Sequence, residues 1–170
     1  MSEEYPDIPE YIKKMIASGR KIDEIRIDRD GNWFHNGEPF TNKKIINYFN
    51  NSIDITEDGT YVLRYSRFVY PILVEDVPFF ISGVRFEGSG NTEKAIITFT
   101  SREEEELDVR TLQYKHEVGL YCRVRKGRMP AKFRRSPSFQ ILDRLEENED
   151  IYYLNISGNK IVLKEKMEDE

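Results

Sequence analysis

The chain of 170 residues is long enough for one domain or two small ones, and its 38% hydrophobic and 34% charged residues are typical of a globular protein. An aromatic content of 12% excludes a disordered chain, and a single cysteine, Cys122, excludes a disulfide framework or a cysteine-based zinc site. No apolar run approaches the roughly 18 residues that cross a bilayer, and the N-terminus lacks a secretory signal pattern, so we expect a cytoplasmic protein without membrane association.

Two helices and two tight turns are predicted in the first third of the chain. Residues 7–18 carry apolar side chains at helical spacing, which predicts an amphipathic helix. Asp30-Gly31 and Asn36-Gly37 are dipeptides that favour hairpin turns, because they tolerate positive φ. A second helix is predicted over residues 43–50, with Thr41 as its N-cap. Its expected buried face consists of Ile45, Ile46 and Phe49.

A long strand region is predicted to follow from residue 61, with edge positions or bends at Pro71 and Pro78, because proline cannot donate a ladder hydrogen bond. The segment Gly88-Ser-Gly-Asn91 is predicted to be a loop and the division between two domains. Further strands are predicted over residues 95–99 and 107–109. The expected domains are residues 1–87, an N-terminal helix with a first α+β domain, and residues 88–170, a second, β-rich domain.

The order hairpin, helix, strand, strand is predicted twice. It begins at residue 30 in the first half and at residue 118 in the second, where the helix is expected over residues 139–147. Few residues are identical between the two copies, so the correspondence is one of pattern. We therefore predict an α+β fold that is predominantly antiparallel and roll-like, with few short helices and two halves that share a motif.

The first copy also carries a family resemblance. The sequence Gly31-Asn-Trp-Phe-His-Asn-Gly-Glu-Pro39, the helix after it and Val74-Glu-Asp-Val-Pro-Phe79 make residues 25–80 similar to the bacterial domain of unknown function 1285 (DUF1285) family. The resemblance implies a two-part α+β roll with a recurring motif, no established activity and a suggested part in signal transduction. The chain departs from the family at Ser66-Arg-Phe68, so a ligand there would differ. The motif residues are Gly31, Trp33, Gly37, Pro39, Glu75, Asp76, Pro78 and Phe79.

One segment is strongly basic, although the whole chain has a net charge of −5. Residues 123–135 hold seven Lys and Arg residues and no acidic residue. Strand alternation would place Arg123 and Arg125 on one face, opposite Cys122. Such a face suits a phosphate, a carboxylate ligand or an acidic partner, whereas the structural alternative is pairing with residues 103–106 or a solvated edge hairpin. The candidate ligand-binding residues are Arg123, Arg125, Lys126, Arg128, Lys132, Arg134 and Arg135.

Two patterns near the first turn have a structural and a functional interpretation. Asp28, Asp30 and Asn32 resemble the start of a calcium loop, but Trp33 and Pro39 occupy the positions that need Gly and Glu, so a hairpin turn is predicted. Trp33 also suits an aromatic rim around a ligand. A core role is predicted instead, because large aromatic residues at strand positions are usually buried.

Other chemistry is weakly indicated. Glu75-Asp76 interrupts an apolar run, which favours a bend before Pro78 over a pocket lining. Cys122 is predicted to be a buried, inert thiol rather than a nucleophile. His35 and His116 lack the ligand spacing of a metal site, so neither a metal nor another cofactor is expected.

The sequence favours a non-enzymatic module that binds a small ligand or a protein partner, with any pocket expected between the two halves. The first alternative is association with nucleic acid through residues 123–135, which the acidic net charge makes unlikely. The second is a hydrolase that uses Glu75, Asp76 or Cys122. A homodimer is compatible with the sequence but is not required by any residue.

Overall fold

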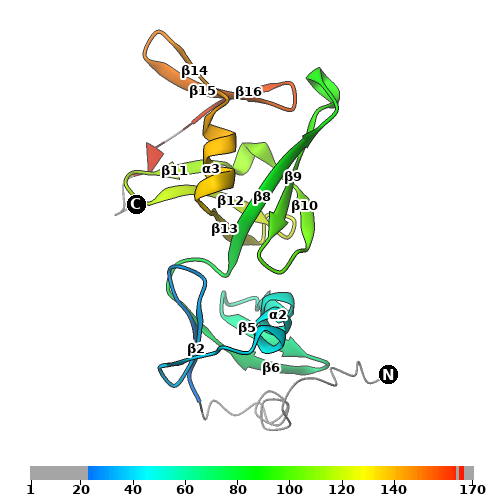
Figure 1. Cartoon of the computed structure of the whole chain (residues 1–170), viewed down its shortest axis with the longest axis vertical. Coiled ribbons are helices and arrows are strands. Elements are labelled where there is room, and N and C mark those ends of the chain that lie inside the picture. The colour runs from blue at the N-terminus through cyan, green and yellow to red at the C-terminus, as the bar shows by residue number, and fades with distance from the viewer. Residues whose placement is uncertain (1–22, 164, 167–170) are drawn as a thin grey trace. The chain divides into compact units, whose positions relative to one another are not determined.

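The computed structural model describes residues 23–163, 165 and 166 and divides the chain into two compact units between Pro78 and Phe79 (Figure 1). We call residues 1–78 unit 1 and residues 79–170 unit 2. The helix predicted over residues 7–18 lies outside the described residues. No helix within the described part of the chain has the length and apolar composition needed to cross a membrane.

The division between the units comes earlier than the boundary expected after residue 87, by the length of one strand. Strand β8 (Phe79–Glu87) pairs along its length with β9 (Lys94–Phe99), so both belong to the same sheet. The glycine-containing segment after residue 87 is therefore the connection of a long hairpin within unit 2. Composition alone does not distinguish such a connection from a linker, because both favour Gly, Ser and Asn.

Unit 1 contains a four-stranded sheet, one helix and a three-stranded meander. The sheet has the order β3-β2-β1-β7, in which the β1–β7 pair is parallel and the other pairs are antiparallel. The meander β4-β5-β6 is antiparallel throughout. The elements are β1 (Ile25–Ile27), β2 (Trp33–His35), β3 (Glu38–Pro39), α2 (Lys43–Ser52), β4 (Ile53–Ile55), β5 (Tyr61–Tyr65), β6 (Phe68–Pro71) and β7 (Leu73–Val74).

Helix α2 confirms the helix predicted from residue 43, although its N-cap is one residue later than expected. The Asn42 side chain accepts hydrogen bonds from the backbone N–H groups of Lys44 (2.9 Å) and Ile45 (3.3 Å), so Asn42 rather than Thr41 satisfies the first turn. The buried residues of the helix are Ile45, Tyr48 and Phe49, whereas Ile46 is half-buried.

Unit 2 contains a seven-stranded sheet in the order β10-β9-β8-β13-β12-β11-β17, one α-helix and a second meander, β14-β15-β16. The β8–β13 and β11–β17 pairs are parallel and the others antiparallel. The remaining elements are β10 (Glu104–Glu106), β11 (Gln113–Lys115), β12 (Gly119–Val124), β13 (Met129–Phe133), α3 (Arg135–Leu142), β14 (Leu145–Asn148), β15 (Ile151–Ile156), β16 (Asn159–Val162), β17 (Glu165–Lys166) and the 3₁₀ turns η1 (Gly90–Thr92) and η2 (Val109–Thr111). The predicted α+β, mostly antiparallel class is confirmed.

The predicted repeat of element order is present and is longer than expected. A hairpin (β2–β3 or β12–β13), a helix (α2 or α3) and a three-stranded meander follow one another in both units. Helix α3 starts and ends earlier than the helix predicted over residues 139–147, because Pro137 lies in its first turn and residues 145–148 form β14. The strand predicted over residues 107–109 is wrong, since Asp108 instead caps η2 by accepting the backbone N–H of Arg110.

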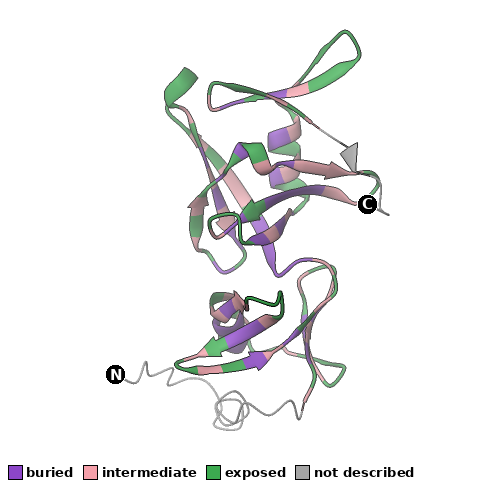
Figure 2. Ribbon diagram, turned by 180° about the vertical axis from the view of Figure 1, so that it is seen from behind, coloured by how far each residue is buried: buried purple, intermediate pink, exposed green. Residues whose placement is uncertain are grey.

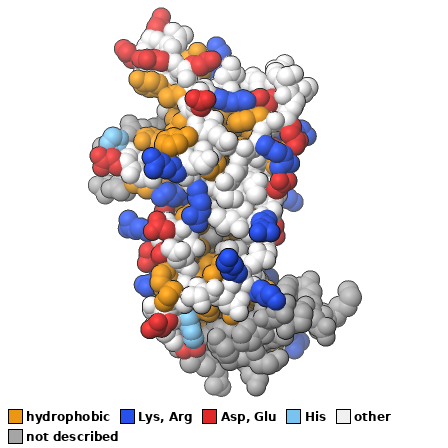
Figure 3. Space-filling model, in the orientation of Figure 1, with side chains coloured by type: hydrophobic (Ala, Val, Ile, Leu, Met, Phe, Trp, Pro, Cys, Tyr) orange, Lys and Arg blue, Asp and Glu red, His pale blue; other side chains and the backbone are white. Residues whose placement is uncertain are grey.

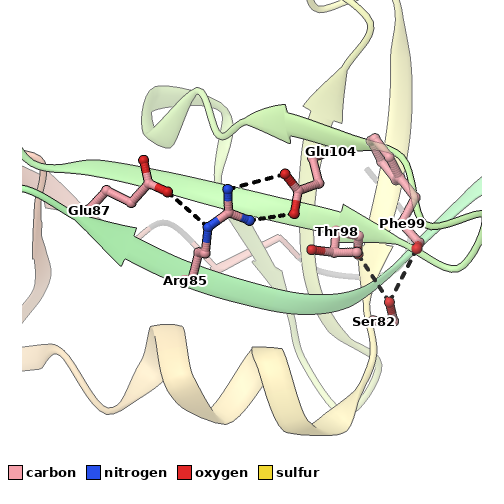
Figure 4. A network of polar contacts seen from close by, with 6 residues as sticks. All are labelled: Ser82, Arg85, Glu87, Thr98, Phe99 and Glu104. Carbon is pink, nitrogen blue, oxygen red and sulfur yellow. Dashed lines mark hydrogen bonds and ion pairs between the residues drawn. The ribbon is translucent and has the colours of Figure 1, made fainter.

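Alternation along β12 and β13 separates a buried face from a polar one. Leu120, Cys122 and Val124 on β12 point into the core, and α3 packs against the neighbouring strands β8 and β13 (Figure 2). On the far side of β8 from α3, Arg85 donates hydrogen bonds to Glu87 and Glu104 and ties β8 to β10 across β9 (Figure 4). The Arg85 ion pairs therefore connect β8 to β10 on the face of the sheet away from α3.

The second meander is fastened to the β8–β9 hairpin by one carboxylate. Glu93 accepts hydrogen bonds from the Arg144 guanidinium (3.0 Å) and from the backbone N–H of Ser157 (2.9 Å). The guanidinium lies 3.6 Å from the ring centroid of Phe86. Gly158 in the β15–β16 turn lies so close to Asn91 that an added Cβ would be 2.6 Å from its side-chain oxygen. These contacts join the hairpin, the end of α3 and the meander.

Replacing Glu93 by glutamine tests this fastening. Hydrogen bonds from Arg144 and Ser157 hold the pKa of Glu93 below its ordinary value of 4.5, so the charged form stabilises the fold. That stabilisation is complete above the ordinary pKa and is lost as the pH falls through the lower folded-state pKa. We expect Glu93→Gln to lose about 1–3 kcal/mol in urea unfolding at pH 7, and the difference to shrink on acidification below about pH 4.

The matched control is Glu106→Gln, which removes an exposed carboxylate of β10 from the same unit. It is expected to change the free energy of unfolding by no more than about 0.5 kcal/mol. An equal loss in both variants would contradict the assigned role of Glu93.

Candidate anion-binding surface

The basic segment 123–135 covers the end of β12, the turn 125–128, β13 and the start of α3. In Figure 3, lysine and arginine side chains lie beside hydrophobic ones on the visible face of the molecule. The structure places the seven predicted basic residues in several different environments, so they do not form one uniform patch.

Arg123 is used to hold its own hairpin. Its guanidinium donates hydrogen bonds to the backbone carbonyls of Gly127 (3.1 Å) and Arg128 (3.0 Å) in the turn. Its backbone N–H donates to the hydroxyl of Thr111 (2.9 Å), which connects β12 to η2. Arg123 therefore has a structural role in this conformation.

Arg125 closes the turn against the β10 edge. Its guanidinium forms ion pairs with Glu103 and Glu105, and its backbone N–H donates to Glu105 (2.9 Å). It also lies over the rings of Phe79 (5.1 Å) and Phe99 (5.2 Å). Arg125 therefore pairs with residues 103–106, which the sequence analysis gave as the structural alternative to ligand binding.

Arg125 does not share a strand face with Arg123, as the sequence pattern had suggested. Strand β12 ends at Val124, and Arg125 adopts a positive φ of 53° in the turn. Strand alternation stops where the backbone leaves the extended region. The side chain is consequently directed toward the carboxylates of β10.

Two lysines converge on one aromatic ring. The Lys115 ammonium lies 4.3 Å and the Lys132 ammonium 5.8 Å from the ring centroid of Tyr121, a side chain that is only 4% exposed. No ion pair joins either ammonium to a carboxylate of the described residues. Two positive charges therefore lie against one aromatic ring.

The sheet register explains why these side chains meet. Gln113, Tyr121, Lys132 and Phe80 occupy one row across four adjacent strands, β11, β12, β13 and β8. Gly119 pairs with Lys115, and an added Cβ at Gly119 would lie 3.5 Å from Cε of Lys132. The Lys132 stem therefore lies beside Gly119, at ordinary van der Waals distance from where a side chain would begin. We call Lys115, Tyr121 and Lys132 the lysine–tyrosine surface.

Other basic residues of the segment lie over different aromatic rings or in the exposed turn. The Arg134 guanidinium lies 5.5 Å from the centroid of Phe80, and that of Arg135 lies 5.5 Å from the centroid of the exposed Phe139. Lys126 and Arg128 lie in the exposed turn. Cations stacked on aromatic rings are stabilised by the ring quadrupole, so this part of unit 2 concentrates positive charge on aromatic surface.

The family-motif residues of the two hairpin turns have structural positions in unit 1. Gly31 (φ 86°) and Gly37 (φ 85°) adopt the positive φ that the two hairpin turns require, and Pro39 is exposed on β3. Trp33 is 1% exposed, packs on Phe49 and donates its indole N–H to Asn50 (2.9 Å), which confirms its core role.

The acidic pair before Pro78 forms a bend, as predicted. The backbone N–H of Glu75 donates to the carbonyl of Ile27 (3.0 Å), and the Glu75 carboxylate accepts the backbone N–H of Arg29 (3.2 Å). Asp76 is half-buried in the bend, and Pro78 is buried directly before Phe79 at the start of β8. These contacts fix the end of β7 beside β1.

Neither a calcium loop nor a reactive thiol is supported. A carboxylate oxygen of Asp28 accepts the backbone N–H groups of Asp30 (2.9 Å) and Asn32 (2.8 Å), which is the geometry of the predicted hairpin turn. No group of three His, Cys, Asp or Glu side chains within the described ranges could hold a metal ion. Burial raises the pKa of the Cys122 thiol, which disfavours the nucleophilic thiolate.

Of the three residues of the lysine–tyrosine surface, only Lys132 was predicted from the sequence. Lys115 and Tyr121 lie outside the basic segment 123–135. The available signal was weak: Gly119 separates Lys115 from Tyr121 in a short hairpin, and a glycine inside a strand often marks a close approach. The register that brings Lys132 beside Tyr121 depends on a turn whose length the sequence did not specify.

The fold and surface define an α+β protein of two units with a repeated motif. No family model matches the chain, and no curated protein matches it. Among solved structures, it is similar to a DUF1285 family protein from Silicibacter pomeroyi DSS-3, with a TM-score of 0.68 and 22% identity over 82% of this chain and 79% of that one. It is also similar to a DUF1285 family protein from Shewanella baltica OS155, with a TM-score of 0.57 and 17% identity over 73% and 94% of the two chains. These structures confirm the predicted resemblance at the level of the fold.

Two adjacent turn residues allow a matched test of the Arg125 contacts. Arg125 and Lys126 both have positive φ, but Lys126 is exposed and takes part in no ion pair with the described residues. Arg125→Ala leaves a buried oxygen of Glu105 without its cation, so we expect a loss of about 1–3 kcal/mol in unfolding free energy. Lys126→Ala is expected to stay within about 0.5 kcal/mol of the unaltered protein. Urea unfolding followed by far-UV circular dichroism measures the stability of both variants. Equal losses would contradict a stabilising role of the ion pairs that Arg125 forms with Glu103 and Glu105.

Proposed function

We propose that this protein is a non-enzymatic binding module that holds an anion against the lysine–tyrosine surface of unit 2. The supporting observation is the approach of Lys115 and Lys132 to one buried tyrosine ring without an ion-pair partner among the described residues. The anion is a phosphate or carboxylate group of a small ligand or of an acidic partner. A role in signal transduction fits a protein that senses such a ligand.

Electrostatics favours an anion at this position. The ammonium groups of Lys115 and Lys132 repel each other. An anion bound near both replaces this repulsion by two attractive interactions. The Tyr121 ring excludes water from one side, so an interaction there is screened less than one in open solvent. Lysine provides three donors on a flexible stem, which suits a phosphate approached as a point charge.

Nucleic acid is a weaker candidate for this surface. Binding to a nucleic-acid backbone calls for a row of free cations, and Arg123 and Arg125 are committed to the turn and to the β10 carboxylates. A thiol hydrolase is opposed by the burial of Cys122. Among the described residues, no separate contact supports nucleic-acid binding or a thiol hydrolase.

The test compares anions on the full chain and on two doubly substituted variants. Thermal unfolding is measured with inorganic phosphate, pyrophosphate, citrate, an acidic peptide and a short oligonucleotide, at low and moderate salt. A ligand at 100 times its Kd is expected to add about 2.7 kcal/mol of stability. Lys115→Gln/Lys132→Gln is expected to weaken binding about tenfold or more, because both charge-assisted hydrogen bonds are lost.

The control variant is Lys43→Gln/Lys94→Gln, which changes the net charge equally at two exposed lysines of α2 and β9. It is expected to bind like the unaltered protein. Equal weakening in both variants would reduce the effect to net charge and would refute the site. A stabilisation seen only with the oligonucleotide, and lost steeply with salt, would favour nucleic acid instead.

A further inference from the structure

The second meander, β14-β15-β16, has an apolar face that the described residues leave uncovered. Leu154 and Ile156 on β15 are fully buried on its core face. On the opposite face, Ile151 and Val162 are 53% and 55% exposed. Register places Val162 beside Tyr153, which is two residues from Ile151 on the same strand, so the three side chains share that face.

Unpaired acidic side chains border this face. Glu146 on β14 is in register with Tyr153, and Glu149 and Asp150 form the β14–β15 turn next to Ile151. None of these carboxylates takes part in an ion pair within the described part of the chain. Strand β15, Ile151–Ile156, contains no Lys or Arg. Lys160 on β16 lies on the same face, but its ammonium is placed over the Tyr153 ring, 5.2 Å from the centroid, and not against a carboxylate of the described residues.

Among the described residues, the first meander, β4-β5-β6, differs from the second in having a cross-strand ion pair. There, Asp54 on β4 accepts a hydrogen bond from Arg64 on β5 at 2.8 Å, so the corresponding acidic position is paired across the strands. In unit 2 the middle strand, β15, has no such cation, and Lys160 on β16 lies over Tyr153. The acidic charge of the second meander is thus available to another molecule.

We propose that this face of the second meander, Ile151, Tyr153 and Val162 with the acidic border of Glu146, Glu149 and Asp150, binds a basic amphipathic helix of a partner protein. A helix packed on a sheet is one of the few stable two-layer arrangements. An apolar centre with a charged rim is the usual composition of a protein interface. The six residues of β15 extend about 20 Å, which is the length of roughly 13 helical residues.

Charge selects a basic partner over a second copy of this surface. Two copies packed face to face would bring the same acidic borders together, and like charges across an interface oppose association. A helix with a leucine stripe flanked by lysines instead matches both the apolar centre and the rim. This surface is separate from the lysine–tyrosine surface, so the two proposals stand or fall independently.

The probe is a fluorescein-labelled 14-residue peptide of leucine and lysine, with leucines at helical spacing, and a scrambled peptide of the same composition. Binding to the full chain is measured by fluorescence anisotropy, and hydrogen exchange reports protection of residues 145–162. We expect the patterned peptide to bind and to protect these residues. Equal binding of the scrambled peptide would overturn the proposal.

Two variants separate the apolar centre from the rim. Ile151→Thr/Val162→Thr keeps β-branched side chains and removes apolar surface, and Glu146→Gln/Asp150→Asn removes two charges; each is expected to weaken binding about tenfold. Glu38→Gln/Glu57→Gln removes two exposed charges elsewhere and is expected to leave binding unchanged. Equal weakening by this control would overturn the proposal.

Sedimentation tests the other occupant of the face. The unaltered chain is expected not to dimerise through this face. A dimer formed through it would appear with increasing concentration and would be abolished by Ile151→Thr/Val162→Thr. Such a dimer would assign the face to a second copy and overturn the partner helix.

Discussion

The two-residue period of the β12–β13 hairpin is the constraint on which unit 2 depends. It directs Leu120, Cys122 and Val124 into the core and Tyr121 and Arg123 to the opposite face. A slip of one residue would bury Arg123 and expose the apolar set, so burial enforces the register. The same register brings Lys132 beside Tyr121 and thereby creates the lysine–tyrosine surface.

Two arginines of the basic segment 123–135 stabilise the turn of the β12–β13 hairpin. Arg123 donates to turn carbonyls, and Arg125 is clasped by Glu103 and Glu105. These arginines stabilise a four-residue turn in which Arg125 and Lys126 hold positive φ, a conformation that costs free energy in residues with a Cβ. Lys132, outside the turn, lies over the Tyr121 ring instead.

The two meanders show that one element order supports different surfaces. In unit 1 the meander carries a cross-strand Asp54–Arg64 pair. In unit 2 acidic residues that form no ion pair with the described residues border the exposed Ile151 and Val162. Since packing requires only the inward face of each meander, the outward face is free to vary with function.

The sequence by itself determined the fold class, the repeated element order, the two hairpin turns at Asn36-Gly37 and Asp30-Gly31 and the first helix, because these follow from turn chemistry and periodicity. Only the tertiary structure decided the division before Phe79, since that depends on β8 pairing with residues beyond a glycine-rich loop. It also decided which cations of the described residues form ion pairs. The partners of Arg125 lie twenty or more positions away in the chain, and Lys115 reaches Tyr121 only through strand register, so no local pattern encodes either contact.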